Sequence, residues 1–224
     1  MNIRLTLNEA RVLGSLIEKG ITTPEYYPLS INAITNACNQ KSNRDPVMHL
    51  SEVDVQEAMD SLIKKHLISQ RSTAGSRVTK YAHRFAGTLS KEFDFLPQEL
   101  AVLCVLLLRG PQTAGEIRSR SSRLYEFGGL EEVEKTLTRL SERTDGPYVT
   151  ELSRQPGRRE NRFAHLLCGD VIINEDEILP PEPALSRGHT VDNRLTRLEQ
   201  EVETLREEME DLKNQMKEIS GSSE

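Results

Sequence analysis

The feature that most constrains this chain is an internal repeat. The pattern Asn-Glu-Ala-Arg-Val-Leu at 8–13 returns as Gln-Glu-Leu-Ala-Val-Leu at 98–103, and a glycine follows each copy, at Gly20 and Gly110. Two later landmarks recur in the same order: Val55, Met59 and Leu62 return as Val133, Leu137 and Leu140, and Tyr81-Ala82-His83 returns as Phe163-Ala164-His165. Recurrence in one order predicts two copies of one small domain, with unequal insertions between the landmarks.

The charge is unevenly distributed along the 224 residues and separates the repeat from a tail. We expect a first domain at 1–88, a second domain at 89–169, an acidic Pro-rich linker at 170–190 and a coiled coil at 191–219. The net charge is −6, of which residues 1–88 contribute +3, residues 89–170 contribute −1 and residues 171–224 contribute −8. The acidity therefore belongs to the tail, and the repeated part is nearly neutral with local basic clusters.

In the first copy, apolar spacing predicts helices at 7–20, 31–37 and 52–65. Ser30 and Ser51 are suitable N-caps for the second and third helices, and Gly20 is a suitable left-handed stop for the first. Strands are expected from 67 and over 78–85, with a polar turn at 71–77.

The second copy predicts the same order, with helices at 96–110, from Thr113 through Ile117, and at 130–143, then strands at 148–152 and 162–166. The helix at 96–110 is apolar on nearly every side, so we expect it to pack against the other copy, a partner subunit or both. The predicted fold class is mainly α with small β-hairpins (α+β), arranged as tandem winged helix-turn-helix domains plus a C-terminal coiled-coil helix.

The tail carries an apolar residue at alternating steps of four and three from Val191 to Ile219. This heptad spacing predicts a coiled coil. In a parallel pair of chains, Glu201 of one chain would face Arg206 of the other. An amphipathic helix docked on its own domain is the alternative. We expect a parallel homodimer, with a seam that includes Leu195, Leu198, Val202, Leu205, Met209 and Leu212.

A long polar string in the first copy, Tyr-Pro-Leu-Ser-Ile-Asn-Ala-Ile-Thr-Asn-Ala-Cys-Asn-Gln-Lys-Ser-Asn-Arg-Asp-Pro at 27–46, closely resembles the YceH family of bacterial proteins. The resemblance spans about residues 5–168. It implies a tandem winged-helix fold in a bacterial cytoplasm, and it carries over no catalytic residue or ligand.

Basic residues cluster in and around the two expected wings. A winged helix commonly binds DNA with its third helix in the major groove and its wing on the backbone, where Lys and Arg neutralise phosphates. The candidate nucleic-acid contacts are Lys41, Arg44, Arg71, Arg77, Lys80, Arg84, Arg118, Arg120, Arg123, Arg154, Arg158, Arg159 and Arg162.

The third helices argue against base-specific reading, because their outward positions are rich in carboxylates such as Glu57 and Asp60, or Glu131 and Glu134. Two functions therefore stay open. One is a dimeric DNA-binding or transcription-regulatory protein that contacts DNA mainly through basic wings and loops. The other is a protein-interaction scaffold of tandem winged helices without direct DNA binding, as in the bacterial condensin accessory protein ScpB.

Asn36, Asn39, Asn43 and Arg44 form the densest polar cluster, which would either contact a ligand or partner or form a hydrogen-bonded loop. The sequence shows no phosphate-binding glycine loop, nucleophile elbow or paired-carboxylate pattern, so we do not expect this protein to be an enzyme. We expect no cofactor and no metal site, because the three cysteines lie far apart. The N-terminus lacks the apolar core of a signal peptide and the chain lacks an apolar run that could span a bilayer, which favours a cytoplasmic protein without membrane contact.

Overall fold

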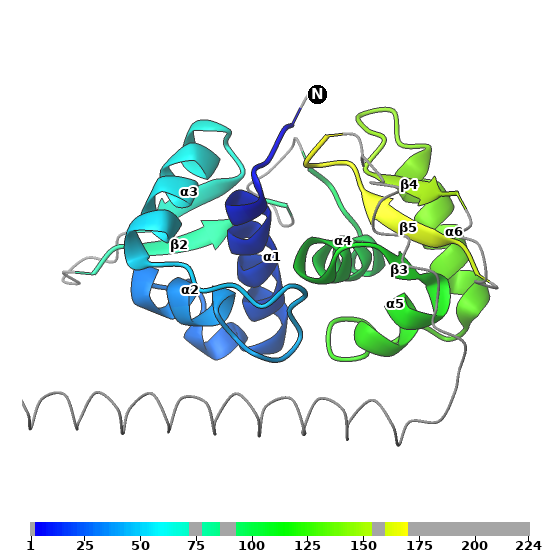
Figure 1. Cartoon of the computed structure of the whole chain (residues 1–224), viewed down its shortest axis with the longest axis horizontal. Helices are drawn as coiled ribbons and strands as arrows, with labels where there is room; N and C mark the ends of the chain where they lie inside the picture. Colours follow the sequence, from blue (N-terminus) through cyan, green and yellow to red (C-terminus); the bar gives the residue numbers. More distant parts are fainter. Residues whose placement is uncertain (1–2, 72–77, 86–92, 154–159, 170–224) are drawn as a thin grey trace, which may run out of the picture. The chain divides into compact units, whose positions relative to one another are not determined.

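A computed structural model describes residues 3–71, 78–85, 93–153 and 160–169 (Figure 1). All of them lie in one compact unit, Met1–Ile173. The fold mixes α-helices with small antiparallel sheets, as the α+β prediction required. The predicted linker at 170–190 and the predicted coiled coil at 191–219 lie outside the described residues.

The elements of the first half follow the predicted order of three helices and two strands. They are α1 (Leu7–Thr22), the short 3-10 helix η1 (Pro24–Tyr26), α2 (Ile31–Cys38), α3 (Glu52–Lys64), β1 (Ile68–Arg71) and β2 (Lys80–His83). The predicted caps are confirmed: the hydroxyl of Ser30 accepts from the Ala33 amide, and that of Ser51 accepts from the Asp54 amide. Asp54 bonds back to the Ser51 amide, so both partners satisfy donors at the start of α3.

The second half repeats this order with one strand that the sequence did not predict. It contains α4 (Pro97–Arg109), β3 (Gln112–Thr113), α5 (Ala114–Arg120), α6 (Leu130–Ser141), β4 (Val149–Leu152) and β5 (Arg162–His165). In space, β5 lies between β3 and β4, and all pairings are antiparallel. The first half has a one-residue counterpart of β3, the bridge between Leu29 and Tyr81 beside the β1–β2 pair. A strand of two residues is too short to leave a period-two pattern.

The two repeated glycines have different roles. Gly110 ends α4 with a φ of 67°, a conformation that favours glycine. The prediction that Gly20 is a left-handed stop is wrong, because α1 continues to Thr22. There the hydroxyl of Thr22 bonds to the Glu18 carbonyl and helps the last turn to form. A Cβ at Gly20 would stand 3.2 Å from Nε2 of His83, so the helix packs tightly at this position.

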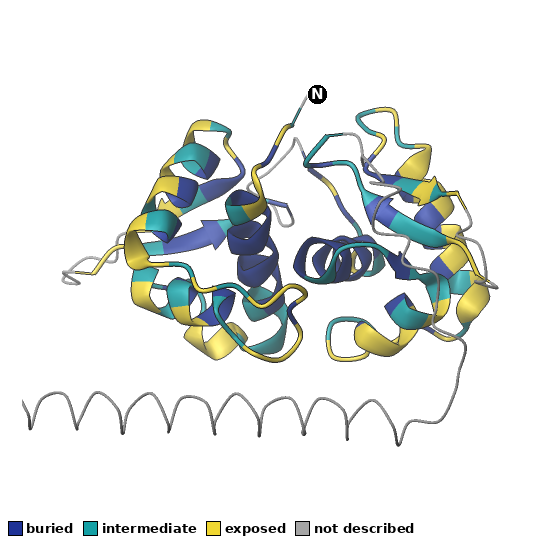
Figure 2. Cartoon of the chain, in the orientation of Figure 1, coloured by how far each residue is buried: buried dark blue, intermediate teal, exposed yellow. Residues whose placement is uncertain are grey.

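Helices α1 and α4, the first helices of the two halves, pack against each other at the centre of the core (Figure 2). A Cβ at Gly14 of α1 would lie 2.9 Å from Cδ2 of Leu108 and 3.1 Å from Cβ of Leu107. The thiol of Cys104 donates to the Gly14 carbonyl across the same contact, at 3.5 Å. The expectation that the apolar helix packs against the other copy is therefore confirmed.

A buried glutamate recurs at the start of both central helices. Glu9 accepts from the Thr6 amide and from Lys65, and Glu99 accepts from the Leu96 amide and from Arg143. Burial alone would raise the pKa of Glu9, but the hydrogen bonds, that from Lys65 foremost, hold this pKa below its ordinary value. In both halves, therefore, a buried carboxylate caps the first helix and pairs with a basic residue at the end of the third helix.

Candidate functional site

Three of the basic residues predicted for the first hairpin lie along its β1–β2 ladder. Arg71 and Lys80 are partners in the β1–β2 register, and the Arg84 amide bonds to the Leu67 carbonyl at 2.9 Å. Lys64, which was not among the predicted contacts, is exposed at the end of α3 and lies three residues before Leu67 in the chain. We call Lys64, Arg71, Lys80 and Arg84 the hairpin face.

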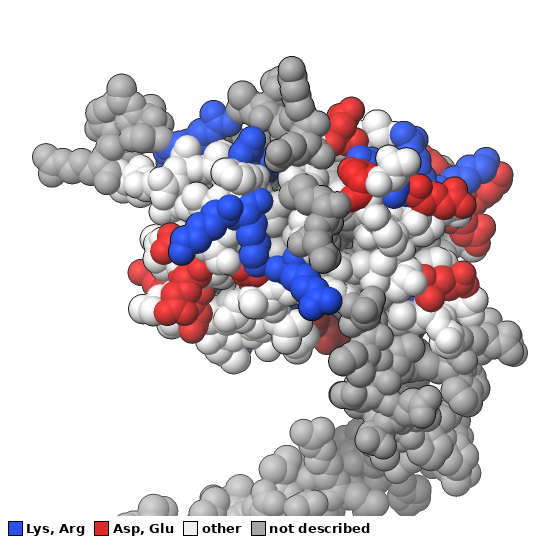
Figure 3. All heavy atoms as spheres, turned by 90° about the horizontal axis from the view of Figure 1, so that it is seen from above, with Lys and Arg blue, Asp and Glu red and all other residues white. Residues whose placement is uncertain are grey.

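Charge is distributed differently over the two halves in the view of Figure 3. Lys and Arg side chains run across the middle of the first half, on the left, whereas they alternate with Asp and Glu on the second half. Within the described residues, no member of the hairpin face forms an ion pair. Lys and Arg side chains are the groups that neutralise the phosphates of DNA.

The hairpin that was predicted to be the second wing is described only in part. Its predicted contacts Arg154, Arg158 and Arg159 lie outside the described residues, as does Arg77 of the first wing. Arg162 on β5 is half-buried, and its guanidinium stands 4.0 Å from the Glu116 carboxylate. Its charge is therefore partly neutralised by its own domain.

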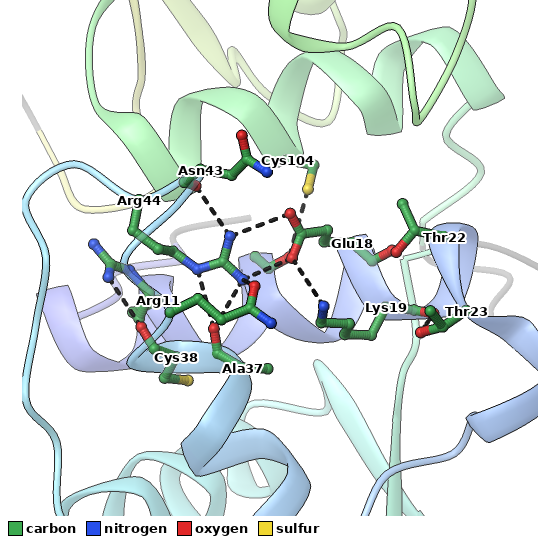
Figure 4. A network of polar contacts seen from close by, with 12 residues as sticks. Arg11, Glu18, Lys19, Thr22, Thr23, Ala37, Cys38, Asn43, Arg44 and Cys104 are labelled. Carbon is green, nitrogen blue, oxygen red and sulfur yellow. Dashed lines mark hydrogen bonds and ion pairs between the residues drawn. The ribbon is translucent and has the colours of Figure 1, made fainter.

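The expectation that Arg44 lies in an exposed loop and contacts phosphate is wrong. Its guanidinium is fully buried and forms a bidentate pair with Glu18, at 2.6 and 3.1 Å (Figure 4). The same group donates to the Ala37 carbonyl through Nε and Nη2, at 3.1 and 2.8 Å. The sequence gives no sign of this because the partner lies 26 residues away, on α1. Arg44 anchors the loop after α2 to α1.

The other members of the polar cluster separate into structural and accessible side chains. The Asn39 side chain forms two hydrogen bonds with the backbone of Leu50, donating to its carbonyl and accepting from its amide, both at 2.8 Å. Asn36 is exposed on α2 and donates to Asn32. Asn43 has a φ of 58° and accepts from the guanidinium of Arg109 on α4. The cluster is therefore mostly a hydrogen-bonded loop, and Asn43 alone of its four residues borders a cleft.

That cleft has a volume of about 710 Å³ and lies where the end of α1 and the loop after α2 approach α4 and α5. We call it the junction cleft. Apolar side chains of α4 and of the loop after α5 line part of its wall, and hydroxyls of both halves line the rest. Its basic lining residues are Lys19, Lys41, Arg109, Arg120 and Arg123. Three of these, Lys41, Arg120 and Arg123, were predicted as separate nucleic-acid contacts, and the fold brings them to one cleft.

Positive charge dominates the junction cleft. Its one acidic lining residue among the described residues, Glu18, is already paired with buried Arg44. Partial burial and the neighbouring charge of Arg120 lower the pKa of Arg109, although an arginine stays protonated at neutral pH. Arg118, also a predicted contact, is exposed on α5 and does not line this cleft.

The exposed faces of the third helices carry carboxylates, as the sequence indicated. Glu52, Glu57 and Asp60 are exposed on α3, and Glu131 and Glu134 are exposed on α6. Carboxylates on a helix in the major groove would be repelled by phosphates, and cytosine alone offers them a base donor. The geometry thus gives no support to base reading by these helices.

The described residues contain no group of three or more His, Cys, Asp or Glu side chains placed to hold a metal ion. Cys38 and Cys104 are buried thiols, and burial raises the pKa of each. Burial lowers the pKa of His83 and of His165 to about 4, so both rings are neutral at pH 7. Every helix in the described ranges is too short or too polar to cross a membrane.

Fold and site together define an α+β protein with an internal repeat, whose basic side chains gather on a hairpin face and in a cleft at the junction of the copies. The family described as "Protein of unknown function, DUF480" matches residues 5–158. A UPF0502 protein of Enterobacter sp. (strain 638) is 49% identical over 210 residues, which cover 92% of this chain and 97% of that protein.

The proteins named UPF0502 protein YceH from Salmonella paratyphi B and Salmonella newport are each 48% identical over 209 residues, covering 92% of this chain and 97% of theirs. This chain belongs to the UPF0502 family of YceH proteins, as the resemblance of residues 27–46 indicated.

Proposed function

We propose that this protein is a non-catalytic tandem winged-helix protein that binds duplex DNA through phosphate contacts of its basic hairpins and loops. The element order supports the winged-helix assignment, because each half has three helices followed by an antiparallel hairpin. The short pairing beside each hairpin, Leu29 with Tyr81 and β3 with β5, supports it further. The β1–β2 hairpin would be the wing of the first half, and the β4–β5 hairpin would be the wing of the second half.

The hairpin face is the observation that carries the proposal. Lys64, Arg71, Lys80 and Arg84 come from the end of α3 and the two strands of one hairpin, and none is neutralised by an ion pair within the described residues. Phosphate contacts of this kind position a protein on DNA but carry no sequence information. With acidic third helices, the mode of binding would depend on the backbone rather than on base edges.

We propose that the tail forms the dimer. A parallel coiled coil over 191–219 would place two copies of the repeated unit on one duplex, so that weak phosphate contacts add up by raising the effective concentration of the second unit. The seam residues lie outside the described residues, and the heptad spacing of the sequence supports this step.

The protein scaffold is a second candidate, favoured by a different observation. Each third helix begins with an exposed apolar residue among carboxylates, Val53 with 66% and Leu130 with 44% of its surface exposed. Apolar residues rimmed by acidic ones suit a basic, amphipathic partner segment better than a phosphate backbone.

A fluorescence anisotropy titration of the full-length protein against random-sequence duplex DNA, repeated over a series of salt concentrations, separates the two candidates. Backbone binding predicts that log Kd changes linearly with log salt, with a slope of about 0.9 per neutralised phosphate. Absence of binding at low salt, or affinity without salt dependence, would rule out the DNA proposal and leave the scaffold.

A further inference from the structure

The junction cleft differs from the hairpin face in shape and in the origin of its residues. Lys19 and Lys41 come from the first half, and Arg109, Arg120 and Arg123 come from the second. Five basic side chains on one cleft repel one another, so a bound anion would relieve their repulsion.

Within the described residues, carboxylates neutralise only part of the positive charge of the cleft. Lys41 and Arg123 are exposed and form no ion pair within the described part of the chain. Arg120 has one carboxylate neighbour, Glu116 at 3.4 Å, on the same helix. The acidic Glu18 pairs with buried Arg44 at 2.6 Å and with Lys19 at 3.9 Å (Figure 4).

The remaining lining sets the size and character of a ligand. A volume of about 710 Å³ lies within the range of small-molecule sites, which combine apolar walls with a few polar groups. Val105, Leu108 and Leu124 supply apolar wall, and hydroxyls such as those of Ser42 and Ser122 add donors near the cations. Guanidinium groups bind phosphate oxygens through paired N–H donors, a geometry that Lys does not offer.

We infer that the junction cleft binds a small molecule that carries one or two phosphate groups on an apolar or aromatic body. The phosphates would lie among Arg120, Arg123 and Lys41, and the body against the apolar wall formed by α4. Because the lining comes from both halves, the bound molecule would bridge the loop after α2 and the end of α5. A concave site of this size encloses a small molecule, whereas duplex DNA would meet only its rim.

Isothermal titration calorimetry of the full-length protein tests the inference with ADP, inorganic pyrophosphate and adenosine. ADP carries both features of the expected ligand, pyrophosphate carries the phosphates alone and adenosine carries the body alone. We expect saturable binding of one ADP per chain, weaker binding of pyrophosphate and still weaker or undetectable binding of adenosine.

A matched pair of variants locates the binding. Arg123→Gln removes an unpaired cation from the cleft, and Arg118→Gln removes an exposed arginine of the neighbouring helix that does not line it. Loss of one charge-assisted hydrogen bond should weaken ADP binding about tenfold or more in Arg123→Gln and leave it nearly unchanged in Arg118→Gln. Lys41→Gln, from the other half of the chain, should weaken it as well.

Three outcomes would overturn the inference. The first is the absence of saturable binding of ADP and pyrophosphate at low salt. The second is an equal loss of ADP affinity in Arg123→Gln and Arg118→Gln. The third is displacement of ADP by duplex DNA, together with equal losses of ADP affinity and DNA affinity in Arg123→Gln. The last outcome would make the cleft part of the nucleic-acid surface. None of them decides whether the hairpin face binds DNA, so the proposed function is tested separately.

Discussion

Replacement of Arg44 by methionine should destabilise the protein strongly, because it leaves a carboxylate without its partner. In the native structure the Arg44 side chain is 0% exposed, and it holds both oxygens of Glu18 and the carbonyl of Ala37. Arg44→Met keeps a similar volume but removes these donors.

The magnitude follows from the burial of the two partners. Breaking a buried ion pair by removing one side costs about 3–5 kcal/mol. Since 12% of the Glu18 side chain is exposed and can regain water, we expect the lower end, about 3 kcal/mol. The double variant Arg44→Met, Glu18→Met removes the unpaired charge and leaves the Ala37 carbonyl, which costs about 1–3 kcal/mol. The double variant should therefore be the more stable of the two.

Urea unfolding at pH 7, followed by far-ultraviolet circular dichroism, gives the free energy of unfolding for each variant. A loss below about 1 kcal/mol in Arg44→Met would refute the structural role, since exposed ion pairs contribute at most about that much. A double variant that is less stable than Arg44→Met would refute the argument that the unpaired carboxylate causes the loss.

Three further predictions concern the core, the pH dependence and the tail. Gly14→Val should lower the free energy of unfolding in urea by about 1–3 kcal/mol, because its Cβ would overlap Leu108, and an unchanged value would contradict the close packing of α1 on α4. Because the pKa of His83 and of His165 falls to about 4 on folding, the unfolded chain binds more protons between pH 6.5 and 4, and stability should fall as the pH is lowered through this window. His83→Phe should reduce that dependence between pH 7 and 4.5, and an identical dependence would disprove the role of this ring. Deletion of 191–224 should lower the mass measured by light scattering to less than half, and a fall of only about 15%, the share of the chain removed, would exclude the coiled-coil dimer.

Local signals in the sequence predicted the elements well, and long-range contacts account for what was missed. Ser30 and Ser51 cap the helices that they were expected to cap, because a cap depends on residues within one turn. The end of α1 was predicted two residues too early. Gly20 lies inside the helix, where it packs close to His83, a residue far along the chain.

The candidate site shows the same division. The sequence identified Lys41, Arg120 and Arg123 as basic residues with a role in binding, but only the packing of α1 on α4 brings them to one cleft. It did not indicate Lys19 or Arg109 as members of that set. Arg44 looked equivalent to Lys41 in the sequence, whereas the fold buries one and exposes the other.

We propose that the hairpin face and the junction cleft are separate binding surfaces. DNA and ADP affinity, measured side by side for Arg71→Gln with Lys80→Gln and for Arg123→Gln, tests this separation. We expect the hairpin variant to lose DNA affinity, with a smaller salt slope, and to keep ADP binding, while Arg123→Gln should lose ADP affinity and keep DNA binding. Parallel losses of both ligands in both variants would contradict it.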